Sequence, residues 1–176
     1  MRILLLFLVI SFCSGCAVLF GNIKPSAKKS DDYKVLDLSQ LSSTWVLISN
    51  SEDLSNPESL DTSDIAYQSK KDSSIISLNS ICQNSHNKIS NMEYFSNQLF
   101  HGIINQRQKN IRPLKVSGTS AIETTLTGEL NKKTVKLRAI IIKQKECIFD
   151  LLYISTPKSF QTNEKVFEKF SNSLKL

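Results

Sequence analysis

The sequence contains few of the residues on which most enzyme and metal sites depend. Among its 176 residues are two histidines, one tryptophan, five glycines and four prolines. Two histidines leave little material for histidine-based catalysis, and so few glycines and prolines exclude a collagen-like or proline-rich fibre. The chain is instead 40% hydrophobic and 22% charged, which is a globular composition, and its length fits one domain of ordinary size.

The first residues have the composition of an export signal. Arg2 supplies a positive charge, and residues 3–12 form an apolar run of about ten residues, too short to cross a bilayer core of roughly 30 Å as a helix. Cys13-Ser14-Gly15-Cys16 follows, with two small residues directly before a cysteine. This stretch resembles the lipobox of bacterial lipoproteins, although Cys13 stands where that family usually has Leu or another aliphatic residue.

The lipobox resemblance implies that residues 1–15 are a signal peptide and that Cys16 is lipidated and begins the mature chain. Each buried methylene of the acyl chains (palmitate, for example) contributes about 0.8 kcal/mol, so two or three chains would anchor the protein firmly on a membrane. Secretion without lipid and an uncleaved anchor are the alternatives. In lipoproteins with a sorting system, Asp after the cysteine favours the inner membrane. Ala17 stands here, which favours the periplasmic face of the outer membrane.

The mature chain divides into a tether and a domain. Residues 16–34 comprise the lipidated cysteine and a segment that is polar from Asn22 onward, without helical or strand periodicity, which predicts a flexible tether. Its root-mean-square reach would be on the order of 20 Å. Residues 35–176 are expected to form a single domain, in which residues 50–64 hold five acidic residues and no basic one and predict an exposed loop.

Apolar patterns in the domain predict antiparallel strands. Residues 65–68 and 74–78 flank a polar turn and predict a hairpin, and the runs 122–130, 135–141 and 147–154 predict a three-strand meander. The last of these runs is apolar on both faces apart from Asp150, as expected of a central strand covered on both sides.

Two segments predict helices. Ser90 and Glu93 form a capping box at the start of the first, and Thr156-Pro157 precedes the second. Their apolar positions recur at helical spacing: Met92, Phe95, Leu99 and Ile103 in the first, and Val166, Phe167, Phe170 and Leu174 in the second. The element order predicts an α+β fold, an antiparallel β-sheet packed by helices.

This element order resembles the Mog1/PsbP-like arrangement. The stretches that follow also resemble a group of uncharacterised bacterial envelope lipoproteins, some of which are associated with lipid-transport ABC systems. They are Gly118-Thr-Ser-Ala, Gly128-Glu-Leu, Cys147-Ile-Phe-Asp-Leu-Leu-Tyr, Phe160, and the Phe167/Phe170 helix. The match covers residues 64–174 and carries no known catalytic residue. It implies an envelope context and a possible transport partner, and it implies no mechanism.

Cys82 and Cys147 are the two cysteines of the predicted domain. An export signal places them in an oxidising compartment, where a pair is more often bridged than free. A disulfide between the second hairpin strand and the central strand would close a loop of about 65 residues, worth on the order of 4 kcal/mol in the chain-entropy model. Two buried free thiols are the alternative.

The sequence holds no established catalytic or metal-binding pattern. A metal site would have to gather Cys82, His86, His101 and Cys147, and no C-x-x-C or H-E-x-x-H accompanies them. Asp150 could be a general base, but a structural acid hydrogen-bonded to a neighbouring strand is the simpler expectation. We therefore expect no metal, no cofactor and no enzymatic activity.

The charge distribution suggests a binding surface. Residues 107–145 hold ten basic and two acidic residues, 10 − 2 = +8. Lys136 and Arg138 share one face of a predicted strand, so they are expected to bind anionic lipid or an acidic partner, with an ordinary solvated face as the alternative. A nucleic-acid partner is not expected for an exported lipoprotein.

These observations lead to three alternative hypotheses for the function of the protein. The first is a membrane-anchored, non-catalytic accessory or binding module of the envelope, which could serve a lipid-transport ABC system. The second is a carrier that holds an apolar ligand between sheet and helices. The third is a hydrolase with an unrecognised site.

Overall fold

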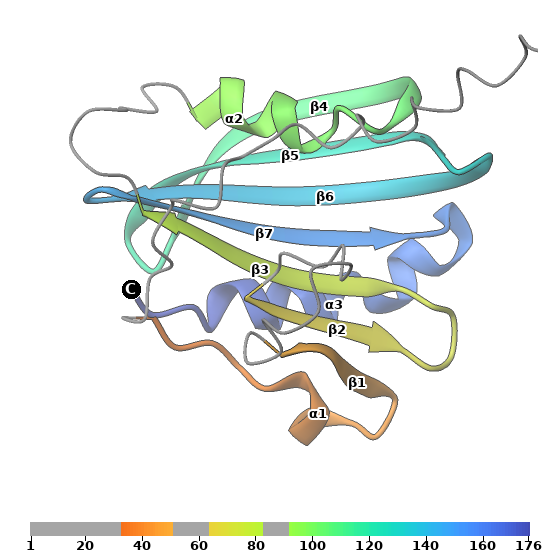
Figure 1. Ribbon diagram of the computed structural model, residues 1–176, viewed down its shortest axis with the longest axis horizontal. Coiled ribbons are helices and arrows are strands. Elements are labelled where there is room, and N and C mark those ends of the chain that lie inside the picture. The colour runs from red at the N-terminus through yellow and green to blue at the C-terminus, as the bar shows by residue number, and fades with distance from the viewer. Residues whose placement is uncertain (1–32, 51–63, 83–91) are drawn as a thin grey trace, which may run out of the picture.

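The computed structural model describes residues 33–50, 64–82 and 92–176, which together form seven strands and three helices (Figure 1). In chain order the elements are α1 (Leu38–Leu41), β1 (Trp45–Asn50), β2 (Ile65–Ser69), β3 (Ile75–Cys82), α2 (Met92–Leu99), β4 (Ile104–Val116), β5 (Thr119–Leu130), β6 (Lys133–Gln144), β7 (Cys147–Ser155) and α3 (Pro157–Asn172). The predicted signal peptide, the predicted lipidation site Cys16, most of the predicted acidic loop and Ser90 of the predicted capping box lie outside the described residues.

The strands form one sheet in the order β1-β2-β3-β7-β6-β5-β4, and every neighbouring pair is antiparallel. The predicted hairpin is β2–β3, and the predicted meander is β5–β6–β7. β7 pairs with β3 on one side and with β6 on the other, so the predicted central strand is confirmed. The α+β fold predicted from the element order is confirmed as well.

The two longer helices cover opposite faces of the sheet. Ile140 and Ile142 of β6 pack in one cluster with the phenylalanines of α3, whereas Ile141, between them, packs with Phe95 of α2. Because successive side chains of a strand point to opposite faces, α3 and α2 must lie on different sides of the sheet. Within the described ranges, no helix is long and apolar enough to cross a membrane.

Helix α3 begins where the sequence predicts. The Thr156 side chain accepts a hydrogen bond from the backbone N–H of Ser159, and Pro157 occupies the first turn, where its missing N–H costs nothing. Tyr153 of β7 stacks on Phe160 and Phe167 at ring-centroid distances of 4.8 and 5.7 Å. Its hydroxyl donates to the Phe160 carbonyl at 2.9 Å, so the buried phenol is satisfied.

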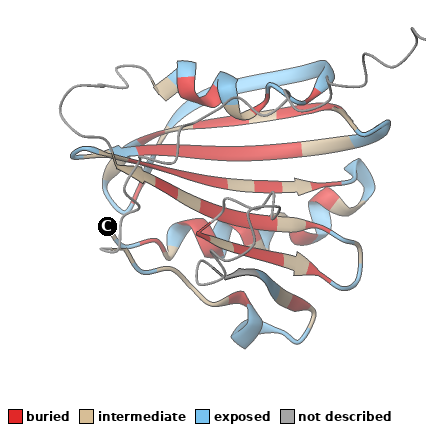
Figure 2. Ribbon diagram, viewed as in Figure 1, coloured by how far each residue is buried: buried red, intermediate tan, exposed pale blue. Residues whose placement is uncertain are grey.

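Strand β4 was not predicted from the sequence. Its first ten residues, 104–113, are all exposed, as the pale-blue strand at the upper edge of Figure 2 shows. Register shifts accompany the positive φ angles of Asn105 and Gln108, and Pro113 is tolerated because β4 is an edge strand. Because these ten residues have no buried face, they show no apolar alternation, and the sequence pattern does not reveal the strand.

The first predicted helix is shorter than its apolar spacing suggests. α2 ends at Leu99, and Ile103 is buried outside the helix, next to the start of β4. Here the chain passes very close to Gly128 of β5. A Cβ on Gly128 would overlap Cγ2 of Ile103 and would stand 3.0 Å from the carbonyl oxygen of Ile104.

The packed domain starts two residues earlier than predicted. The Tyr33 ring lies 5.8 Å from the Phe149 ring, and its hydroxyl donates to Asp64 at 3.2 Å. Lys34 forms a two-hydrogen-bond bridge with Lys175. These contacts assign Tyr33 and Lys34 to the domain and shorten the predicted tether accordingly.

Candidate functional site

Lys136 and Arg138 lie on the same face of β6, as predicted, but their surroundings differ from those of an exposed patch. The Lys136 ammonium stands 4.3 Å from the centroid of the Phe160 ring. Arg138 is 7% exposed and lies beneath α3, with its guanidinium 5.6 Å from the Phe167 ring. The prediction that the two residues together present charge to an anionic surface is therefore wrong for Arg138, because burial removes it from the surface.

Three glutamates hold the Arg138 guanidinium. Glu123 of β5 accepts from it at 2.7 and 2.8 Å, and Glu164 and Glu168 of α3 accept at 3.2 and 3.1 Å. Arg112 of β4 donates to the second oxygen of Glu123 at 2.6 Å. The formal charge of this network, with two arginines and three glutamates, is 2 − 3 = −1. Part of the positive charge counted between residues 107 and 145 is therefore neutralised inside the fold.

The charge state of Arg138 follows from these partners. Burial lowers the pKa of Arg138, but hydrogen bonds and charges from the glutamates outweigh burial and raise it above its usual value. Arg138 is thus a permanently charged link between the sheet and α3. Sequence reasoning missed this role, although the spacing of Glu164 and Glu168, four residues apart on one helix face, was a visible signal.

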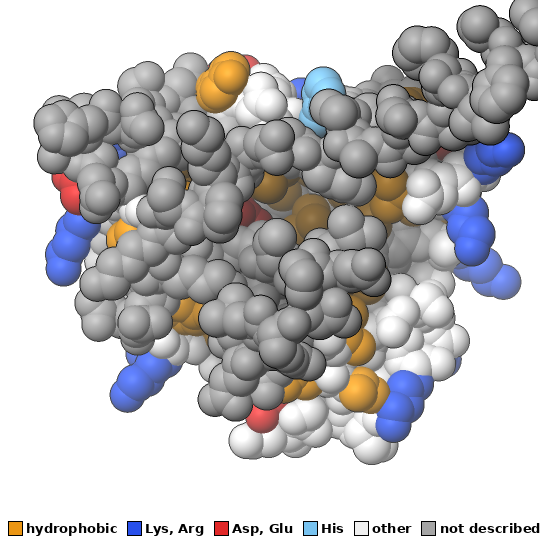
Figure 3. Space-filling model, viewed as in Figure 1, with side chains coloured by type: hydrophobic (Ala, Val, Ile, Leu, Met, Phe, Trp, Pro, Cys, Tyr) orange, Lys and Arg blue, Asp and Glu red, His pale blue; other side chains and the backbone are white. Residues whose placement is uncertain are grey.

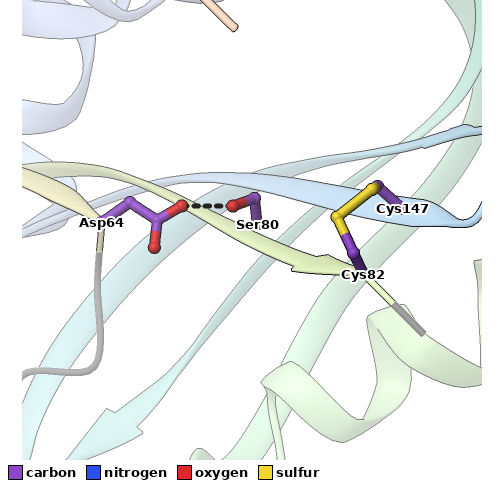
Figure 4. The surroundings of a disulfide bond; sticks show 4 residues. All are labelled: Asp64, Ser80, Cys82 and Cys147. Carbon is purple, nitrogen blue, oxygen red and sulfur yellow. Dashed lines mark hydrogen bonds between the residues drawn. A yellow bond between two sulfur atoms is a disulfide. The ribbon is translucent and has the colours of Figure 1, made fainter. Parts of the chain in front are cut away.

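The structure joins Cys82 and Cys147 by a disulfide bond, so the predicted pairing is confirmed (Figure 4). The two cysteines are directly opposite each other at the ends of β3 and β7. Because both sulfurs are bonded to each other, neither can serve as a thiolate ligand. The four-residue metal site considered from the sequence would therefore lack both of its cysteine ligands. His101 is exposed, His86 lies outside the described residues, and no cluster of three or more metal-ligating side chains occurs in the described ranges.

The same pair of strands carries a hydrogen-bonded polar pair near the disulfide, of which Asp150 is buried. Asp150 of β7 is 2% exposed and accepts a hydrogen bond from the Asn79 side chain of β3 at 3.1 Å. The two residues are directly opposite in the ladder. Asp150 is therefore a structural acid hydrogen-bonded to a neighbouring strand, which was the simpler of the two expectations.

Burial raises the pKa of Asp150 to about 7; the hydrogen bond from Asn79 lowers it, and the charge of Asp64 raises it further. The unfolded value is about 3.9. Between these values the folded chain holds a proton that the unfolded chain releases. Stability from this group is therefore complete below about pH 4 and is lost as the pH rises toward about 7.

A second polar cluster ties the N-terminal residues to the sheet. Ser80 of β3 donates to Asp64 at 2.5 Å (Figure 4). Tyr33 donates to the same carboxylate oxygen at 3.2 Å. These contacts fix the entry of the chain beside β3.

The space between the sheet and α3 is filled by side chains. Phe160, Phe167 and Phe170 are each at most 2% exposed and pack with Tyr153 and Ile140 in one cluster. A depression of about 570 Å³, open to solvent, lies instead between Leu36 and residues 165–173. Its lining includes charged lysines and Glu168, so it does not resemble the apolar cavity expected of a carrier.

The comparison with known proteins identifies the fold. No family model matches this sequence, and no curated protein matches it. One similar solved structure is cyanobacterial PsbP (CyanoP) from Synechocystis sp. PCC 6803, with a TM-score of 0.57 and 10% identity over 93% of this chain and 98% of that one. Another is LpqN, involved in cell envelope biogenesis of Mycobacterium tuberculosis, with a TM-score of 0.58 and 10% identity over 85% of this chain and 84% of that one. The domain therefore has a PsbP-like fold, as its element order predicted.

Proposed function

We propose that the protein is an envelope lipoprotein, anchored through lipid on Cys16, that acts as a non-catalytic accessory or binding module. The observation that carries this proposal is the Cys13-Ser14-Gly15-Cys16 motif at the end of an export signal. The Cys82–Cys147 disulfide supports it independently, because stable disulfides are typical of oxidising compartments outside the cytoplasm.

The similarity to LpqN also supports an envelope role. LpqN is involved in cell envelope biogenesis in its own organism, and it shares the fold at 10% identity. A shared fold alone does not transfer an activity. The similarity supports the envelope context that the lipobox-like motif favours.

The finer proposal concerns the location and the partner. Ala17 after the lipidated cysteine favours the periplasmic face of the outer membrane. The resemblance of residues 64–174 to envelope lipoproteins associated with lipid-transport ABC systems favours a component of such a system as the partner. In this role the domain supplies a binding surface, and the transporter supplies the energy for lipid movement.

The anchor is tested with a matched pair of cysteine substitutions. Cys16→Ser should abolish incorporation of an alkyne-labelled palmitate and leave the precursor uncleaved, because the acceptor thiol is gone. Cys13→Leu, which restores the usual lipobox residue and also removes one cysteine, should be labelled like wild type. Equal labelling of Cys16→Ser and wild type would contradict lipidation at Cys16.

The location is tested at the following position. Ala17→Asp should move the protein from the outer-membrane to the inner-membrane fraction of a density gradient, whereas Ala17→Ser should leave it in place. If wild type is already in the inner-membrane fraction, the outer-membrane assignment is wrong, while lipidation at Cys16 is unaffected.

The accessory role is tested in cells. Transfer of pulse-labelled phospholipid between the two membranes should slow in a strain that lacks the protein, and wild type should restore it. Cys16→Ser should restore it poorly, because the domain is no longer held at the membrane. Unchanged transfer in the strain without the protein would rule out the lipid-transport partner.

A further inference from the structure

One end of the sheet gathers the termini of the domain with two strand turns. Ser117, in the β4–β5 turn, donates to the Leu174 carbonyl, and Lys175 bridges to Lys34. Thr119, at the start of β5, donates to the Gln144 side chain in the β6–β7 hairpin at 3.0 Å. We call this the anchor-proximal end, because the chain enters the domain here from Cys16. It is the left-hand end of Figure 1, where the C-terminus is marked.

Exposed lysines from four separate segments lie at the anchor-proximal end of the sheet. They are Lys34 at the entry of the chain, Lys115 near the end of β4, Lys145 in the β6–β7 turn and Lys175 near the C-terminus. We call these four the proximal lysines. Glu146 is the acidic residue of the same turn. Figure 3 shows basic side chains projecting from this left-hand edge of the molecule.

The opposite end of the sheet carries a comparable set, which provides an internal control. The distal lysines are Lys70 and Lys71 in the β2–β3 turn, Lys132 and Lys133 at the β5–β6 turn, and Lys158 in the first turn of α3. All five are exposed. The two ends are separated by the length of β6, twelve residues, or about 40 Å at roughly 3.4 Å per residue.

We propose that the proximal lysines dock the domain on anionic lipid head groups of the membrane that holds the Cys16 lipid. This inference rests on the proposed lipid anchor. Sixteen residues, 17–32, separate Cys16 from Tyr33, and even fully extended they span at most about 58 Å. The lipid therefore keeps the proximal end within about 58 Å of the membrane, and the distal end lies a further sheet length from the point of attachment.

Charge and attachment act together in this arrangement. Among the described residues, the four lysine ammonium groups outnumber the Glu146 carboxylate of the β6–β7 turn and complement a surface of phosphate head groups. The anchor makes docking intramolecular, so the effective concentration of the membrane at the proximal end is high. Each lysine near an anionic surface should change the ratio of docked to undocked protein by about fivefold.

The test measures lysine reactivity in the full lipidated protein. Reconstituted vesicles of phosphatidylcholine alone are compared with vesicles that also contain phosphatidylglycerol, and acylation by an amine-reactive ester is quantified for each lysine by peptide mass spectrometry. On the anionic vesicles the proximal lysines should react several-fold more slowly. The distal lysines should react at the same rate on both. At 1 M salt, where the Debye length is about 3 Å, the difference should disappear.

Two double variants each remove two positive charges, one at the proximal end and the other at the distal end as a matched control. Lys115→Gln with Lys145→Gln should weaken docking about 25-fold and restore the reactivity of Lys34 and Lys175. Lys132→Gln with Lys133→Gln should leave the protection of the proximal lysines unchanged.

Equal reactivity of the proximal lysines on both vesicles, or equal protection of the two ends, would overturn the inference. So would an equal loss of protection in both double variants. If wild type carries no palmitate label, the proposed function itself fails. If wild type is labelled but its proximal lysines are unprotected, only the docking inference fails.

Discussion

Substitution of Arg138 by methionine tests whether the buried ion pair links the sheet to α3. Methionine fills a similar volume but leaves Glu123, whose side chain is 4% exposed, without two of the hydrogen bonds that it accepts. Removing one partner of a buried pair costs about 3–5 kcal/mol. Because Arg112 still donates to the other oxygen of Glu123, we expect a loss in the free energy of unfolding at the low end of this range, about 3 kcal/mol.

The loss in the free energy of unfolding is measured by urea unfolding and the shift in melting temperature by thermal unfolding, both with the oxidised, unlipidated protein and circular dichroism. At about 2–4 °C per kcal/mol for a chain of this size, the melting temperature should fall by roughly 6–12 °C. Glu168→Gln removes a half-exposed partner of the same guanidinium and should cost less than about 1 kcal/mol.

A double variant separates the ion pair from simple packing. Arg138→Met combined with Glu123→Leu removes the uncompensated buried charge, so most of the stability should return. The reasoning is refuted if Arg138→Met alone costs less than about 1 kcal/mol, or if the double variant is no more stable than the single one.

Three other changes have defined outcomes. Asp150→Asn should stabilise the protein at pH 8 by up to about 4 kcal/mol and have little effect at pH 4, because folded Asp150 has a pKa of about 7; equal effects at both pH values in urea unfolding would contradict this. Cys82→Ala with Cys147→Ala should lower stability by about 4 kcal/mol, because the disulfide closes 65 residues, and free alkylation of both wild-type thiols after non-reducing denaturation would refute the bridge. Gly128→Ala should lower the melting temperature, since its Cβ would overlap Ile103, whereas Gly102→Ala, which meets no atom within 4 Å, should be tolerated sterically.

The central part of the fold could be predicted from the sequence because burial leaves a pattern there. The run from Cys147 to Ile154 is apolar on both faces, and it is the middle strand of the sheet. Thr156-Pro157 marks the start of α3 for a purely local reason, since the cap and the fixed proline φ favour a helix start at that point. The Cys82–Cys147 pairing followed from the cysteine count and the export signal.

The tertiary structure alone decided the roles of the exposed and charged residues. β4 is a strand because it pairs with β5, and its ten exposed residues carry no periodic signal. Arg138 looked like part of a basic face, but its partners Glu164 and Glu168 lie 26 and 30 residues later in the chain. A run of charge in a sequence does not show which charges meet in space. Conversely, charges that are far apart in the sequence can lie together in the fold. The proximal lysines come from four distant segments, and strand register and the bridge between Lys34 and Lys175 bring them to one end of the sheet.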